Sequence, residues 1–215
     1  MAKGIEDTVK TDFAIFLQEQ APKWNATLRI FPLNAQDRDA AGDVIFSDET
    51  RLSLIEFKSY EKSLAEEKRK PKRARLCALL IDEHRMQWYH DRCHFACWWM
   101  DNSICLNVYR NEVCNQSIFR DLDFLPDKAD PSSRFSIDDY AESFFTAKAG
   151  SLPLEEFEAY LAWVMVETSG SDKSTVSVQA RNHTLQHYAT IDFASLKDAH
   201  EWFSAHRPKP EPRQR

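Results

Sequence analysis

The sequence predicts a mixed α/β fold in which a helix is followed by three strands, a second helix and a fourth strand. Three observations predict it. Apolar residues recur at helical spacing near the N-terminus and again after Pro71, and short runs of branched and aromatic residues lie between and after them. The 215 residues are 43% hydrophobic and include only four glycines, which suits a packed core.

The first element is a helix expected over residues 5–20, where apolar side chains recur every three or four positions. Pro22 ends it. Alternation over 27–31 predicts a strand, and the polar segment 32–41 is expected to be a loop.

A hairpin is predicted over residues 42–58, where two apolar runs flank a polar turn at 47–50. Side chains alternate across a strand, so Glu56 and Lys58 share one face. In an antiparallel pair the start of the first strand lies beside the end of the second. We therefore expect Asp43 next to Glu56 and Lys58.

This set of two carboxylates and one ammonium group suits phosphodiester cleavage. Carboxylate oxygens are the ligands that hard divalent cations prefer. A metal held there can polarise a phosphoryl oxygen and activate a water molecule. A neighbouring lysine can position or deprotonate that water and stabilise charge on the phosphate.

Asp43, followed by an E-x-K sequence at Glu56 and Lys58, resembles the signature of the PD-(D/E)xK nuclease superfamily, with Gly42 in place of its proline. The resemblance implies an αβββαβ restriction-endonuclease-like core. It also implies Mg²⁺ or Mn²⁺ held by Asp43 and Glu56, Lys58 acting on the water, and Glu6 as an additional acid. An acid in the first turn of a helix also simply favours the helix dipole, so both interpretations of Glu6 stay open.

The densest positive stretch follows the hairpin, over residues 68–75. Pro71 suits the first turn of a helix, which the apolar spacing extends to residue 87. This helix start could hold a phosphate backbone, with Lys72 and Arg73 as the candidates. The alternative is an ordinary solvated charged face.

The resemblance implies a nucleic acid as partner, DNA rather than RNA, in restriction, repair, phage defence or mobile-element biology. A net charge of −6 does not give the basic footprint typical of nucleic-acid binding, so a local groove has to supply it. Two alternatives remain. One is a nuclease-like module that binds nucleic acid or protein without turnover. The other is an ordinary hairpin in which Glu56 and Lys58 form an exposed salt bridge.

The five cysteines, with no secretory signal before them, predict reduced thiols in a cytoplasmic protein. The group formed by His84, His90, Cys93, His94 and Cys97 lacks a second ligand pair for zinc, so we expect buried thiols and surface histidines. No run of 18 apolar residues is present, which predicts no membrane span.

The predicted organisation is a nuclease core over 1–120, with strands near 94–100 and 104–109, and a linker or surface loop over 121–136. A C-terminal extension follows over 137–206, with two helices, two strands and a last helix capped by Ser195. We expect this extension to serve substrate recognition, a protein partner or a homodimer. The tail 207–215 is expected to be disordered.

Overall fold

The computed structural model describes residues 2–33, 41–169, 176–182, 187–193 and 198. Its elements in chain order are α1 (Ala2–Gln20), η1 (Ala21–Trp24), β1 (Arg29–Pro32), β2 (Val44–Ser47), β3 (Arg51–Tyr60), η2 (Glu61–Arg69), α3 (Pro71–Asp82), α4 (His84–Cys93), β4 (His94–Met100), β5 (Ser103–Val108), α5 (Tyr109–Val113), η3 (Pro131–Ser133), β6 (Phe135–Ser136), α6 (Ile137–Phe145), β7 (Leu152–Pro153), α7 (Leu154–Ser169), β8 (Val176–Asn182) and β9 (His187–Phe193).

A seven-stranded mixed sheet runs through the molecule in the order β1-β2-β3-β4-β5-β6, and β7 pairs with β3 outside this path. The strands β1, β2 and β3 pair antiparallel, β3 and β4 pair parallel, and β4 and β5 pair antiparallel. A parallel pair needs a long crossover, which η2, α3 and α4 supply. The pair β8 and β9 forms a separate antiparallel sheet. The predicted mixed α/β class is confirmed.

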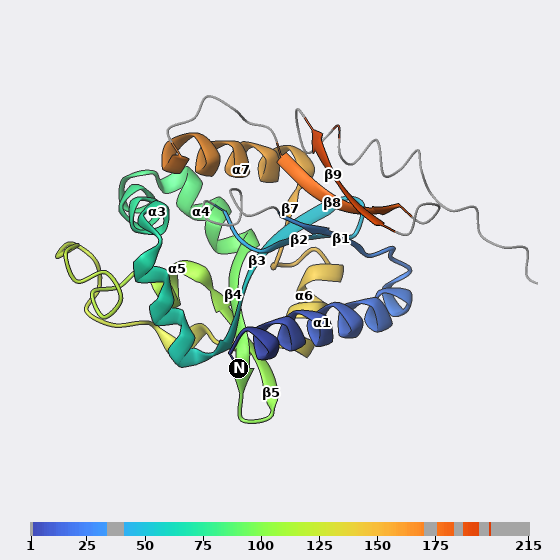
Figure 1. The fold of residues 1–215 in the computed structure, drawn as a ribbon, viewed down its shortest axis with the longest axis horizontal. Helices are drawn as coiled ribbons and strands as arrows, with labels where there is room; N and C mark the ends of the chain where they lie inside the picture. The colour runs from blue at the N-terminus through green and yellow to red at the C-terminus, as the bar shows by residue number, and fades with distance from the viewer. Residues whose placement is uncertain (1, 34–40, 170–175, 183–186, 194–197, 199–215) are drawn as a thin grey trace, which may run out of the picture.

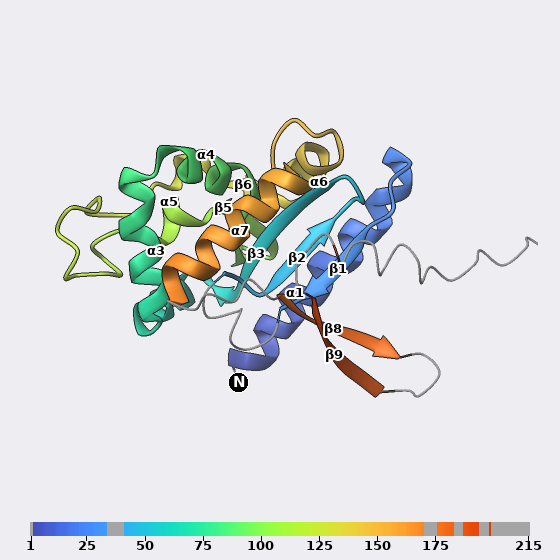
Figure 2. The same ribbon diagram turned by 90° about the horizontal axis from the view of Figure 1, so that it is seen from above.

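Helices cover both faces of the large sheet (Figures 1 and 2). On one face Phe13 of α1 packs edge-on against Phe46 and Phe57, with ring centroids 5.1 and 5.4 Å away. The other face carries α3, α4 and α7, and Leu54 and Trp98 are buried there. Because side chains alternate along β3, the residues two and four positions after Leu54 also point toward α3.

The helix expected after Pro71 is two helices, α3 and α4, which break at Glu83. The residues expected in a C-terminal extension contribute to the large sheet and its cover. Leu152 of β7 pairs with Leu52 of β3, and α7 packs on α3, α4 and β3. The end of the segment expected as a linker, 121–136, also joins the sheet, since Ser136 of β6 pairs with Cys105 of β5. The helix expected after Ser195, apart from Asp198, and the tail lie outside the described residues.

No helix in the part of the chain that the structure describes is long and apolar enough to cross a membrane.

Candidate active site

The pairing of β2 with β3 brings Asp43 beside the end of β3. Val44 pairs with Ile55, and the backbone N–H of Asp43 donates to the carbonyl of Ile55 at 3.0 Å. The carboxylate of Asp43 accepts from the backbone N–H of Phe57 at 2.8 Å through Oδ2. The expected neighbourhood of Asp43 and Glu56 is therefore present in the structure.

Gly42 has a steric role where the superfamily signature has proline. A Cβ added there would come within 2.8 Å of the Leu54 side chain. A side chain at position 42 would therefore require the buried Leu54 side chain to move, and glycine avoids this clash where the chain passes close to β3.

Glu56 is fully buried, and both of its oxygens accept hydrogen bonds from cationic side chains. Its Oε1 accepts from the ammonium groups of Lys58 and Lys70, the second at 2.7 Å. Its Oε2 accepts from Nη2 of Arg73 at 2.7 Å. Arg73 also donates to the carbonyl oxygen of Ala41 at 2.6 Å, which joins α3 to the chain just before the hairpin.

A second buried carboxylate, Glu67 of η2, contacts the same cations. Its Oε1 lies 3.0 Å from Nζ of Lys58 and 2.9 Å from Nζ of Lys70. Its Oε2 lies 3.5 Å from Nε of Arg73 and accepts a hydrogen bond from the hydroxyl of Tyr109 at 2.7 Å. The two ammonium groups therefore bridge the two glutamates.

Charge pairing sets the protonation states in this cluster. Burial would raise the pKa of Glu56, but the charges of Lys58, Arg73 and Lys70 outweigh it and hold the pKa well below its ordinary value of 4.5. Burial would lower the pKa of Lys58, but the neighbouring carboxylates, Glu56 first, raise it instead. At neutral pH Glu56 is ionised and Lys58 is protonated. In this arrangement Lys58 is suited to positioning and charge stabilisation rather than to removing a proton.

A chain of buried hydrogen bonds runs from Tyr160 of α7 to His90 and His94, and His94 contacts Tyr109, which binds Glu67. Burial lowers the pKa of His90 and of His94, so both rings are neutral. The backbone N–H of Arg110 donates to Nε2 of His90 at 3.1 Å, which assigns the His90 proton to Nδ1. That nitrogen donates to the Tyr160 hydroxyl at 2.6 Å, and the hydroxyl donates to Nδ1 of His94 at 2.7 Å. The expectation of surface histidines is therefore wrong for His90 and His94, which are buried, and confirmed for His84, which is exposed. The His94 ring stacks on Tyr109.

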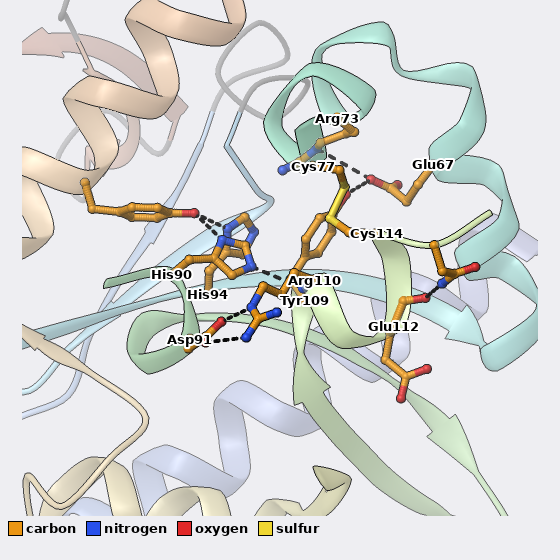
Figure 3. The surroundings of a disulfide bond; sticks show 12 residues. Glu67, Arg73, Cys77, His90, Asp91, His94, Tyr109, Arg110, Glu112 and Cys114 are labelled. Atoms are coloured by element: carbon orange, nitrogen blue, oxygen red, sulfur yellow. Dashed lines mark hydrogen bonds and ion pairs between the residues drawn. A yellow bond between two sulfur atoms is a disulfide. The ribbon is translucent and has the colours of Figure 1, made fainter. Parts of the chain in front are cut away.

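A disulfide joins Cys77 of α3 to Cys114, the residue after α5 (Figure 3). Arg73 lies one turn before Cys77, and Tyr109 is the first residue of α5. The disulfide thus connects the two helices that supply contacts to Glu67. The prediction that all five cysteines are reduced thiols is wrong for this pair. The free cysteines are buried: Cys93, Cys97 and Cys105.

The other predicted residues have different surroundings. Glu6 is half-buried on α1, which packs on the sheet face opposite to that of Glu56, and its role as an additional acid stays a prediction. Lys72 is half-buried near the start of α3. Arg73 is fully buried, and its guanidinium binds Glu56 and the carbonyl of Ala41. A phosphate backbone does not reach Arg73 in this arrangement.

The sequence reasoning did not identify Glu67, Lys70 or Tyr109 as site residues. A glutamate three positions before a lysine in a helical segment is a detectable pairing signal. Their burial depends on the way η2 and α3 fold back over the end of β3, and no local pattern reports that.

The oxygens of Asp43 and Glu56 are donors that Mg²⁺ prefers, and the low pKa of Glu56 keeps it ionised. The cationic side chains of the protein itself bind Glu56 in this structure. Within the described residues, no group of three or more His, Cys, Asp or Glu side chains is arranged to hold a metal. The donor types therefore fit a divalent cation, and at least one cationic side chain has to move for that cation to bind.

The fold and this cluster define a mixed α/β protein with a buried ionic site at the end of a central strand. No protein-family model, curated protein or solved structure matches the chain. A function for the chain therefore has to follow from its own residues.

Proposed function

We propose that this protein is a metal-dependent nuclease of the PD-(D/E)xK type that hydrolyses phosphodiester bonds, with DNA as its substrate. The observation that carries the proposal is the register of β2 against β3, which brings Asp43 beside Glu56 with Lys58 on the same face. The element order agrees with the αβββαβ core that the resemblance implies.

Mg²⁺ or Mn²⁺ bound by Asp43 and Glu56 would supply Lewis-acid activation of the phosphate and of a water molecule. Lys58, which is protonated, would orient the substrate phosphate and stabilise the charge that develops on it. Arg73 and the second carboxylate, Glu67, hold the Lys58 side chain and α3 in place. They act as positioning residues.

The nucleic acid would approach along the start of α3, where four basic side chains are partly or fully exposed: Lys68, Arg69, Lys72 and Arg75. Arg75 lies 3.8 Å from the exposed carboxylate of Glu167, so this pair is weak and can be replaced by a phosphate contact. Such a local basic surface is compatible with a net negative chain, because phosphate contacts are made locally.

The test is cleavage of single- and double-stranded DNA and RNA with Mg²⁺ or Mn²⁺. Glu56→Gln and Lys58→Gln are expected to lower the rate by about 100-fold or more, since each removes a charge at the reacting phosphate or its metal. Glu66→Gln and Lys62→Gln, at exposed positions of η2, are the matched controls and should cleave like the wild type. Cleavage that survives both site substitutions in folded protein would contradict the assignment.

A second candidate function is a nuclease-like module that binds nucleic acid without turnover. The observation that favours it is the engagement of both Glu56 oxygens by cations. Such a module would bind DNA in a gel-shift assay with no metal-dependent cleavage, and Glu56→Gln would not change its affinity for added Mn²⁺.

A further inference from the structure

We propose that Lys70 is a removable counter-charge, which leaves Glu56 when a nucleic-acid backbone binds and so couples metal binding to substrate binding. This inference rests on the proposed function and adds a form of regulation to it. In the absence of nucleic acid, Lys70 blocks the metal site. In its presence, the site opens.

Lys70 is the cation of the cluster that has access to solvent. Its side chain is 25% exposed, compared with 5% for Lys58 and 0% for Arg73. Lys58 and Arg73 also donate to buried carbonyl oxygens, at 3.2 and 2.6 Å. Within the described residues the Lys70 ammonium contacts only the carboxylates of Glu56 and Glu67, at 2.7 and 2.9 Å.

The backbone around Lys70 also permits its side chain to move. The residue lies between η2 and α3, where its φ and ψ of −104° and 97° are extended rather than helical. Its side chain makes no capping hydrogen bond to the start of α3. A change in its side-chain rotamer therefore disrupts neither helix. Arg73, in contrast, is fixed within α3, and its guanidinium lies over the Tyr109 ring in a cation–π contact, 5.1 Å from the ring centroid.

The charges explain why the lysine has to leave. Three carboxylates, of Asp43, Glu56 and Glu67, stand against three cationic groups, of Lys58, Lys70 and Arg73, so the formal charges of these six groups cancel. A divalent cation would enter a neutral cluster against the repulsion of three cations. Departure of Lys70 leaves three carboxylates against two cations, and Oε1 of Glu56 then accepts from one ammonium group, that of Lys58, in place of two, so the site attracts a divalent cation.

A phosphate backbone supplies the force for that departure. Lys68 and Arg69 precede Lys70 directly and are exposed, and Lys72 follows it. A nucleic acid bound along this stretch would offer Lys70 anionic oxygens at the surface in place of those of Glu56. The flexible four-carbon stem of lysine lets the ammonium reach either partner.

The experiment measures Mn²⁺ binding to the full chain by electron paramagnetic resonance of free Mn²⁺, with and without a phosphorothioate DNA duplex that resists cleavage. Lys70→Gln is expected to bind Mn²⁺ about 10-fold tighter than the wild type in the absence of DNA, since one like charge is removed from the site. DNA is expected to tighten Mn²⁺ binding to the wild type, and much less to the variant. Lys62→Gln, at an exposed position of η2, is the control and should keep the wild-type affinity for Mn²⁺ and the wild-type response to DNA.

Adding Glu56→Gln to Lys70→Gln should abolish the gain in Mn²⁺ affinity, which would assign that gain to the site at Glu56. Equal Mn²⁺ affinities of Lys70→Gln and wild type, in a protein whose cleavage depends on Glu56, would overturn the coupling and leave the nuclease proposal standing. Mn²⁺ binding and cleavage that are both insensitive to Glu56→Gln would overturn the nuclease site together with the inference.

Discussion

The disulfide between Cys77 and Cys114 is expected to contribute about 3.8 kcal/mol to the free energy of unfolding. The two cysteines are 37 positions apart, so the bond closes a loop that contains the rest of α3, α4, β4, β5 and α5. The loop-entropy relation assigns such a loop a loss of about 13 cal/mol/K in the unfolded chain, which is about 3.8 kcal/mol at 25 °C.

Urea unfolding of oxidised and reduced protein measures this contribution. Reduction of the wild type, or the double change Cys77→Ser and Cys114→Ser, should lower the midpoint by about 1–2 M urea. Cys105→Ser, at a free buried thiol, is the matched control. The urea midpoints of its oxidised and reduced forms should differ by as much as those of the wild type. The double variant should show none.

Thiol counting under denaturing conditions supplies an independent check of the same bond. Three cysteines are free in the structure, so three alkylated thiols are expected without reductant. Five alkylated thiols, together with equal midpoints in the presence and absence of reductant, would refute the pairing and the reasoning based on it.

Three further results are expected from the buried charges. Glu67→Gln should lower the free energy of unfolding by about 3–5 kcal/mol in urea, because it removes a carboxylate that neutralises buried cations. Glu66→Gln, at an exposed position, should leave that free energy almost unchanged. Equal losses in the two variants would contradict a role for Glu67 in pairing buried cations. Because burial lowers the pKa of His90 and of His94, the unfolded chain binds protons below pH 6.5 that the native chain does not. Stability should therefore fall by about 1.4 kcal/mol per pH unit for each histidine as the pH drops from 6.5 to 5, and an unchanged slope in His94→Gln would count against it. Burial acts to raise the pKa of Glu56, but the surrounding cations outweigh it and depress that pKa, so its contribution to stability is present above pH 4.5 and lost in more acidic solution. Glu56→Gln should remove this acid-dependent loss in unfolding curves measured from pH 5 to 3.

Local patterns were sufficient to predict most elements of the first 110 residues. Alternating and helical spacing of apolar side chains predicted α1, the hairpin of β2 and β3, and the strand β4 close to their observed bounds. The neighbourhood of Asp43 and Glu56 was predicted for the same reason. The pairing of two strands across a short turn follows from the alternation of their side chains and from the length of the turn, and residues close together in the sequence determine both. The break between α3 and α4 at Glu83 was missed, since the apolar spacing continues across it.

The sequence by itself therefore determined which residues form the hairpin and which acids meet at its end. Only the tertiary structure decided what surrounds them. Glu67 and Lys70 lie in a charged stretch that resembles a solvated surface, yet the packing of α3 on the sheet buries one completely and most of the other. The contact of His90 with Tyr160 spans 70 positions, and the partner of Cys77 was one of four other cysteines. Such contacts depend on how distant helices pack over one strand end, and neither periodicity nor spacing along the chain contains that information.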